Sequence, residues 1–437
     1  MSKVNIIAIV DKDDDFSINE PYINYNLNDN KIFTYTFWKR KFTAFSSFFS
    51  YTGLDLFYIS LIVFGVDRKF LRESTEDGWT RSFKVFIPVL EFDKWCENKT
   101  QLEELLNFLS GDLWEIEFRK RKLIDYEIDA REIINNTKFE KLNINKICMF
   151  SGGLDSFIGA IDVLEQGNIS DVLFVSHYGG GKGVIEYQKV LRENLISEYN
   201  LNENHFYSFY ASAKNGIEDT TRTRSFMFFA HAIVLASAMN KNVNLLIPEN
   251  GLISLNIPLT NSRLGSSSTR TTHPYYMSML QRLINNLKID VTLKNPYQFL
   301  TKGEMIERCL NLNFLKDNIE NTMSCSHPDQ GRMNGDTVTS HCGYCLPCVI
   351  RRASILKAKI KDSSSYRDID FTSGNTAKTN LMSYRIGLEK FNERTSFLKI
   401  QSSGPIVDRI EDYTGVYNRG MRELTLLLEK IDEAVLS

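Results

Sequence analysis

The spacing of apolar residues changes near residue 146, where short apolar runs begin to alternate with longer segments of helical period. The runs lie at residues 147–150, 172–176, 206–210, 243–248 and 289–293, and the helical segments at 157–164, 184–199, 225–240, 275–287 and 303–312. Strands that alternate with helices of this length are typical of a parallel sheet with helices on both faces. We therefore predict an α/β fold with a Rossmann-like parallel sheet, whose ligand lies beyond the carboxyl ends of the strands.

The segments on either side of this core have other patterns. Runs rich in β-branched and aromatic residues predict strands at 4–10, 32–38, 83–89 and 114–118, and a helical period predicts a helix at 102–109. Apolar periodicity near 381–391 and 422–435 predicts two helices in the tail. We predict an N-terminal α+β domain at 1–143, the α/β domain at 144–361, and a C-terminal helical extension at 362–437.

Composition and charge exclude several classes of protein. The 52 lysine and arginine residues face 54 aspartate and glutamate residues, so the formal net charge is −2. This balance argues against binding of nucleic acid through overall charge, and 12% aromatic residues exclude wholesale disorder. The most apolar run, 53–66, is interrupted by Asp55 and is too short to span a bilayer, and residues 1–15 lack a signal-peptide pattern. We expect a cytoplasmic protein with reduced thiols and no membrane partner.

The first predicted core strand ends in a glycine turn with the sequence Phe150-Ser151-Gly152-Gly153-Leu154-Asp155-Ser156. Two glycines allow a tight turn, and unpaired N–H groups at the start of the next helix form a nest for an anion such as pyrophosphate. The lysine-bearing pattern of the usual nucleoside-triphosphate loop is absent from the turn. The alternative interpretation is a well-capped strand–helix turn that binds nothing.

Four of the seven cysteines lie close together in the sequence, at Cys325, Cys342, Cys345 and Cys348. In a reducing compartment this spacing favours a metal over disulfides, and four thiolates suit a tetrahedral structural Zn²⁺. A site in which His327 or His341 replaces one cysteine, an iron–sulfur cluster, and four unrelated thiols are the alternatives. The other three cysteines, Cys96, Cys148 and Cys309, are expected to be reduced structural thiols.

The glycine turn resembles the signature of the N-type ATP pyrophosphatases, or PP-loop enzymes, which cleave ATP between the α and β phosphates and adenylate their substrate. Residues 324–351 run from Ser-Cys to Cys-Gly-Tyr-Cys-Leu-Pro-Cys-x-x-Arg. With that ending, the chain is similar over residues 146–360 to QueC, a 7-cyano-7-deazaguanine synthase that binds structural zinc. The resemblance implies ATP, Mg²⁺ and Zn²⁺ as ligands of this chain.

The resemblance also implies roles for individual residues. It implies that the nucleotide binds at Ser151, Gly152, Gly153, Leu154, Asp155, Ser156, Tyr178, Gly179 and Arg224, with Arg222 a weaker candidate. It implies catalytic roles for Asp155, Ser156 and Lys302, the last within a Thr301-Lys302-x-Glu304 motif whose lysine approaches phosphate in the family. Glu249 and Asn250 are candidates for binding the guanine edge of the substrate, because a carboxylate accepts from N1–H and the 2-amino group.

Two loops depart from the pattern of the family. Residues 179–183 are Gly-Gly-Gly-Lys-Gly where the family has Gly-Gln, and this loop either approaches a phosphate closely or is simply flexible. A loop at 260–272 is rich in serine, threonine and arginine. Whether Arg263, Arg270 or His273 reads a substrate carboxylate is open at this point, the alternative being exposed loop residues.

The long N-terminal domain, the Pro-Glu-Asn-Gly-Leu segment at 248–252 and the chain length resemble the QueC-like proteins of bacterial antiphage operons, of which QatC is one type. This resemblance implies an ATP-dependent C–N ligase in defence, which activates a 7-deazaguanine carboxylate as acyl-AMP and passes it to an amine on a partner protein of the same operon. The alternatives are 7-cyano-7-deazaguanine synthesis itself, a related activity such as tRNA thiolation, and a degenerate scaffold that binds nucleotide without turnover.

Overall fold

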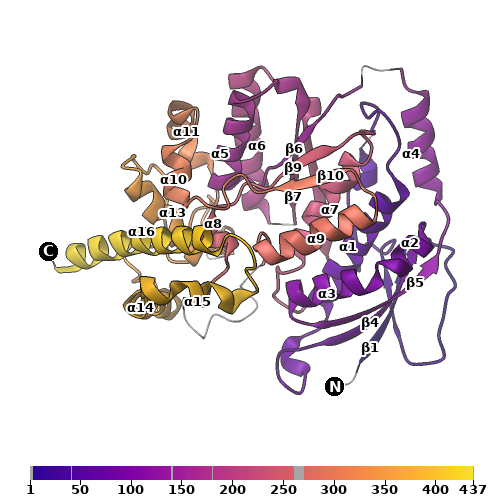
Figure 1. The fold of residues 1–437 in the computed structure, drawn as a ribbon, viewed down its shortest axis with the longest axis horizontal. Helices are drawn as coiled ribbons and strands as arrows, with labels where there is room; N and C mark the ends of the chain where they lie inside the picture. Colours follow the sequence, from indigo (N-terminus) through magenta and orange to yellow (C-terminus); the bar gives the residue numbers. More distant parts are fainter. Residues whose placement is uncertain are drawn as a thin grey trace.

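A computed structural model describes residues 3–40, 42–138, 141–179, 181–259, 270–333 and 335–436. The described residues form two sheets surrounded by helices (Figure 1). The larger sheet has the strand order β10-β9-β6-β7-β8-β3. Its strands are β3 (Phe33–Tyr35), β6 (Lys146–Met149), β7 (Val172–Tyr178), β8 (Phe206–Ala213), β9 (Val243–Leu246) and β10 (Val291–Lys294).

The five strands from β6 to β10 are parallel, as the sequence pattern predicts. Helices separate them along the chain: α5 (Leu154–Glu165), α6 (Lys182–Tyr199), α7 (Arg224–Ala236) and α9 (Pro274–Asn286). Alternate residues of β6 enter different cores, because successive strand side chains point to opposite faces of a sheet. Cys148 packs with α5, whereas Ile147 and Met149 pack with α7 and α9. The predicted α/β fold with helices on both faces is confirmed.

The strand order creates a crevice at the carboxyl end of the sheet. β6 lies between β7 and β9. After β6 the chain adds β7 and then β8 along one edge of β6, and only then does it cross back to add β9 along the opposite edge. Adjacent strands whose connections run to opposite faces define the switch point at which open α/β sheets bind ligands. The glycine turn follows β6 and residues 247–250 follow β9, so both segments lie at this point.

The predicted helix at 303–312 is interrupted in the structure. α10 (Lys302–Glu307) ends early, and α11 (Leu312–Asn318) begins a new helix. The Leu310 N–H donates to the Asp162 carboxylate instead of a helical carbonyl, at 2.9 Å, and the Asn311 side chain caps α11 by accepting from the Phe314 N–H. Local side-chain hydrogen bonds of this kind compete with helix continuation, and helical periodicity alone did not reveal them.

The smaller sheet is built from the first 120 residues and is parallel throughout, in the order β2-β1-β4-β5. Its strands are β1 (Val4–Ile9), β2 (Ile23–Asn26), β4 (Ser82–Val89) and β5 (Leu113–Lys120). The helices of this region are α1 (Tyr51–Lys69), α2 (Phe92–Glu97), α3 (Lys99–Ser110) and α4 (Asp125–Asn136). The region mixes helices and strands as predicted, but the predicted strand at 32–38 does not join the smaller sheet. It becomes β3, which pairs antiparallel with β8 at the edge of the larger sheet.

The two sheets share one hydrophobic core. Residues of α1 pack against α7, and a single cluster of buried apolar side chains runs from Ile6 in β1 to Val291 in β10. The apolar run at 53–66 lies within α1 and is buried here. Among the residues that the structure describes, no helix has the length and apolar character needed to cross a membrane. The predicted domain boundaries at 143 and 361 remain predictions.

The C-terminal part of the chain forms a third core around a long helix, α16 (Ile410–Leu436). This helix packs against α8 (Gly251–Ser254), α13 (Leu346–Lys357) and α15 (Ser396–Ile400), and it is the yellow helix in Figure 1. Two further helices, α12 (Gln330–Met333) and α14 (Asn375–Glu389), complete the fold. The helices predicted near 381–391 and 422–435 correspond to α14 and α16, both of which begin earlier than the periodicity indicates.

Candidate functional site

The glycine turn has the geometry of an open helix N-terminus. Gly152 has a φ of +86°, in the left-handed region that glycine tolerates. The Ser151 hydroxyl donates to Ser156 Oγ at 3.0 Å and accepts from the Gly153 N–H at 3.3 Å. Gly153 is the N-cap of α5 and makes no side-chain cap hydrogen bond. The first N–H groups of α5 therefore lack a side-chain cap, and the positive end of the helix dipole favours an anion there.

Asp155 lies in the first turn of α5 and joins three segments that are far apart in the sequence. Its Oδ2 accepts from the backbone N–H of Asn250 at 3.1 Å and from the Asn250 side-chain amide at 2.7 Å. Its Oδ1 forms an ion pair with Lys302 Nζ at 3.1 Å. All three side chains are buried. The structure thus brings together predicted site residues that lie beyond β6, β9 and β10.

Glu249 places a second carboxyl beside this ion pair. Burial raises the pKa of Glu249, the nearby Asp155 carboxylate raises the pKa further, and Lys302 opposes the shift. When Glu249 is ionised, two carboxylates face one ammonium, and the excess negative charge would suit a hard divalent cation such as Mg²⁺ with its oxygen ligands. Asp155 and Glu249 are the residues that could contribute ligands to such an ion.

Asn250 has a use that the sequence did not suggest. Its side-chain oxygen caps α8 by accepting from the Ile253 N–H at 3.1 Å, while its amide nitrogen donates to Asp155. The residue is fully buried. Both ends of the amide are therefore engaged and Asn250 orients Asp155, while its role at a guanine edge stays a prediction.

A glutamine connects the glycine turn with the end of β7. Gln188 in α6 donates its amide hydrogens to Ser151 O at 3.0 Å and to His177 O at 3.1 Å. Tyr178 and Gly179 follow His177 directly, and the Tyr178 ring contacts that of Tyr210 at 5.4 Å. Sequence reasoning missed Gln188, since nothing in its helical position distinguishes it from a surface residue.

The predicted arginine Arg224 is the first residue of α7, on the same side of the sheet end. It is exposed, and its positive charge contributes to the lowered pKa of the buried His177 imidazole, after burial and His231. The Arg224 side chain therefore lies near the end of β7, whose last residue is Tyr178. Gly180, within the glycine-rich loop at 179–183, lies outside the described residues.

The other arginines that the sequence left open make structural contacts with α3. Arg222 donates to Ser110 O at 3.0 Å, and Arg270 donates to Phe108 O at 2.6 Å. These carbonyls lie at the carboxyl end of α3, where cations interact favourably with the helix dipole. His273 caps α9 by accepting from the Tyr275 N–H. Arg263 lies outside the described residues.

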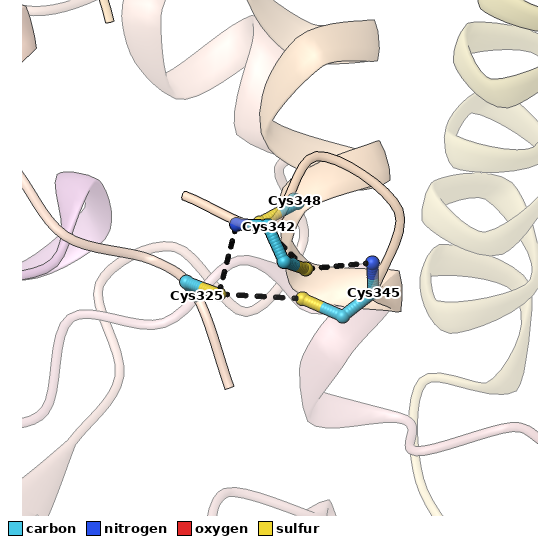
Figure 2. A group of neighbouring side chains, drawn as sticks. All are labelled: Cys325, Cys342, Cys345 and Cys348. Atoms are coloured by element: carbon cyan, nitrogen blue, oxygen red, sulfur yellow. Dashed lines mark hydrogen bonds between the residues drawn. The ribbon is translucent and has the colours of Figure 1, made fainter. Parts of the chain in front are cut away.

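The four clustered cysteines converge at the start of α13 (Figure 2). Their sulfur atoms all lie within 4.8 Å of one another, with Cys325 and Cys345 4.0 Å apart and Cys342 and Cys348 3.9 Å apart. A tetrahedral Zn²⁺ with Zn–S bonds of about 2.3 Å separates its sulfurs by about 3.8 Å. The donor set and its spacing therefore fit a four-thiolate metal site.

Backbone N–H groups donate hydrogen bonds directly to two of these sulfur atoms. The Cys342 N–H donates to Cys325 Sγ at 3.3 Å, and the Cys345 N–H donates to Cys342 Sγ at 3.2 Å. His341 is buried beside the cluster, where its Nε2 pairs with Thr322 O at 3.1 Å and its Nδ1 lies 3.8 Å from Cys348 Sγ. The exposed His327 approaches Cys325 through its backbone N–H. Four cysteines thus complete the set without a histidine.

The remaining cysteines lie apart from this cluster. Cys148 and Cys309 are buried in the core on one face of the sheet, and burial raises the pKa of Cys309 to about 12. Thiols of this kind are poor nucleophiles, since the thiolate is the reactive form. Cys96 is exposed on α2, in the N-terminal region. The buried placement of Cys148 and Cys309 fits the structural role expected for them, whereas the role of the exposed Cys96 stays a prediction.

Comparison with known proteins identifies a family that matches part of the chain. The family model described as queuosine biosynthesis protein QueC matches residues 270–359. This segment includes Lys302 and all four clustered cysteines, and it ends before the C-terminal extension. No curated protein sequence matches the chain. Over the matched segment the chain is similar to QueC proteins.

Proposed function

We propose that the protein is an ATP-dependent C–N ligase that activates a carboxylate as acyl-AMP. The observation that carries the proposal is the convergence of Asp155, Lys302 and Asn250 at the open N-terminus of α5. A helix N-terminus with a buried lysine beside it is suited to hold a pyrophosphate as it leaves. This arrangement lies at the switch point of a parallel sheet, where nucleotides bind in related folds.

In the proposed reaction, a carboxylate oxygen of the substrate attacks the α-phosphorus of ATP, and the bond to the bridging oxygen breaks to release pyrophosphate. The N–H groups at the start of α5 would donate to the phosphates, and Lys302 would neutralise developing charge. The hydroxyls of Ser151 and Ser156 would join them by exchanging their present bonds to Ser156 Oγ and Gly153 O for bonds to phosphate. Mg²⁺, when bound, supplies further charge neutralisation. An amine nitrogen then attacks the acyl carbon, AMP leaves, and the nitrogen loses a proton to give an amide.

The proposed substrate is a carboxylic acid of 7-deazaguanine. Glu249 supports this choice, because it is only partly buried and its ionised form can accept from both N1–H and the 2-amino group of a guanine edge, in which case Asp155 alone would face the metal. The four cysteines would hold a structural Zn²⁺ in this proposal, since four thiolates leave no open coordination position for catalysis.

The setting that we propose is antiphage defence, with the acceptor amine on a partner protein of the same operon. The proposal rests on the sequence resemblance and on the size of the chain outside the matched segment. A large additional region is what selection of a macromolecular acceptor requires. Formation of the free nitrile, as by a 7-cyano-7-deazaguanine synthase, is the competing outcome.

Incubation with ATP, Mg²⁺ and 7-carboxy-7-deazaguanine tests the chemistry, with AMP and pyrophosphate as the measured products. Asp155→Asn should lower AMP formation at least about 100-fold, because Lys302 loses its partner and the phosphate site its geometry. Glu165→Gln is the matched control, since Glu165 is exposed at the far end of the same helix. Folded, metal-loaded protein that forms no AMP in response to the acid would refute the ligase proposal.

The fate of the acyl group is tested separately. Intact-mass analysis of proteins co-expressed from the same operon should show one that gains the mass of the deazaguanine acyl group, and only when Asp155 is intact. A nitrile in the small-molecule fraction with every protein mass unchanged would contradict conjugation and favour the synthase.

A further inference from the structure

The long C-terminal helix α16 contacts the elements that hold Asp155, although it lies outside the segment matched by the QueC family model. Lys302 is the first residue of α10, and Asn250 is the N-cap of α8. α10 has six residues and α8 has four. Helices this short are unstable by themselves, because nucleation is costly and few hydrogen bonds repay it. Both groups that orient Asp155 therefore depend on what packs against α8 and α10.

Polar side chains of α16 fix the start of α10. Glu423 accepts a hydrogen bond from the Thr301 hydroxyl and another from the Gly303 N–H at 3.4 Å, and its side chain is buried. These two donors flank Lys302 in the chain. A Cβ atom on Gly303 would lie 2.5 Å from Glu423 Oε1, so the glycine permits the close approach.

A second residue of α16, one turn earlier, binds the same short helix. Arg419 donates from Nε to Glu304 Oε1 at 2.6 Å and from Nη2 to Phe299 O at 2.7 Å. Glu304 in turn forms a reciprocal capping box with Thr301, which accepts from the Glu304 N–H at 3.1 Å. Charge-assisted pairs with such geometry fix orientation as well as contributing energy. Thr301, Gly303 and Glu304 are thereby each bonded to α16, and Lys302 lies between them in the chain.

The same helix packs on α8 through apolar contact. Gly420 faces Leu252, and a Cβ atom on the glycine would lie 2.7 Å from Leu252 Cδ2. α16 therefore lies against both short helices at once, with Arg419 and Glu423 toward α10 and Gly420 toward α8. A shift of α16 would move Lys302 and Asn250 together relative to Asp155.

We propose that Glu423 and Arg419 are positioning residues, which set Lys302 against Asp155 and so determine how the lysine meets the phosphates of ATP. The expected effect on the reaction rate rests on the proposed function. The placement of Lys302 by these two residues does not, and it can be tested separately. Misplacement of a charged group by about 1 Å is enough to lower a reaction rate substantially.

The test compares Glu423→Ala and Arg419→Ala with Arg422→Ala. Arg422 lies on the same helix and pairs with Glu393 in an exposed contact, so it is the matched control. The first two variants should lower kcat for AMP formation at least about tenfold, with KM for ATP raised. The melting temperature of Arg419→Ala should stay close to that of Arg422→Ala, whereas Glu423→Ala should melt lower because two buried donors lose their acceptor. Glu423→Gln should restore most of the loss, because its amide oxygen still accepts from Thr301 or Gly303.

A second measurement does not depend on catalysis. Brief acetylation of lysines followed by peptide mass analysis should modify Lys302 at least about fivefold faster in Glu423→Ala and Arg419→Ala than in the unaltered protein, with exposed Lys316 as internal reference. Lys302 acetylated at the unaltered rate in both variants would overturn the inference. If Glu423→Ala does not fold, Arg419→Ala alone decides, because the Arg419 side chain is 39% exposed and its removal leaves no large cavity. If the unaltered protein forms no AMP, the ligase proposal is refuted. The acetylation result then decides by itself whether Glu423 and Arg419 position Lys302.

Discussion

Two adjacent glycines in the turn after β6 should respond differently to alanine. Gly152 has a φ of +86°, where a residue with a side chain is disfavoured by about 1–2 kcal/mol. Its new Cβ would also lie 2.9 Å from Gln188 Cγ, which is too close for unstrained contact. Gln188 cannot withdraw freely, because its amide bonds Ser151 O and His177 O, each hydrogen bond contributing about 1 kcal/mol. Gly152→Ala should therefore lower the free energy of unfolding by about 2–4 kcal/mol.

Gly153→Ala is the control at the neighbouring position. Gly153 has a φ of −83°, which alanine adopts readily, and its Cβ would be no closer than 3.4 Å to other atoms. Gly153→Ala should therefore lower the free energy of unfolding by less than about 1 kcal/mol, the scale of an N-cap substitution. Urea unfolding followed by tryptophan fluorescence, without ATP, measures both variants. Equal losses, or a Gly152→Ala variant as stable as the unaltered protein, would show that the turn is not held as described.

Two further predictions concern pH and metal. Burial raises the pKa of Glu423 to about 7, with Glu304 adding to the shift and Lys357 opposing it. The folded state therefore holds this proton more tightly than the unfolded chain, so stability is greatest below the unfolded pKa of about 4.3 and is lost as the pH rises through 7. Compared with Glu423→Gln, the unaltered protein should lose up to about 1.4 kcal/mol of its free energy of unfolding per pH unit between about pH 5 and 7, measured by urea unfolding. If the free energies of the two proteins changed in parallel with pH, the prediction would be contradicted. Cys345→Ser should release stoichiometric zinc, measured by elemental analysis, and lower the melting temperature, whereas Cys96→Ser should do neither; equal zinc in both variants would count against the site.

The sequence predicted much of the fold because the relevant signals are local. Strand and helix periods identified the parallel core, since each element carries its own apolar pattern. The spacing of Cys342, Cys345 and Cys348 identified the cysteine cluster that could hold a metal, since these three residues lie within one knuckle and the start of α13. The glycine turn was equally local, because the strand, turn and helix that shape it are contiguous.

The features that the sequence did not reveal are long-range pairings. β3 crosses from the N-terminal region to pair with β8, and its alternation of side chains is the same whichever sheet it joins. Asn250 resembled a substrate-facing loop residue, because its burial comes from Asp155 and α8, which meet only in the folded chain. Glu423 lies on an amphipathic helix where a carboxylate is ordinary, and its partner Thr301 is 122 residues away.

These long-range pairings have a common consequence for the candidate site. Asp155 comes from the segment before the family match, Lys302 from inside it, and the residues that hold Lys302 in place from the extension after it. The glycine turn can form locally, but the position of the Lys302 charge beside it would depend on α16, as we propose. Lys302 is buried and would be costly to leave unpaired, so its ion pair with Asp155 and the packing of α16 must form together. The C-terminal extension is therefore part of the architecture of the site, and changes in it should act on the chemistry through the position of one lysine.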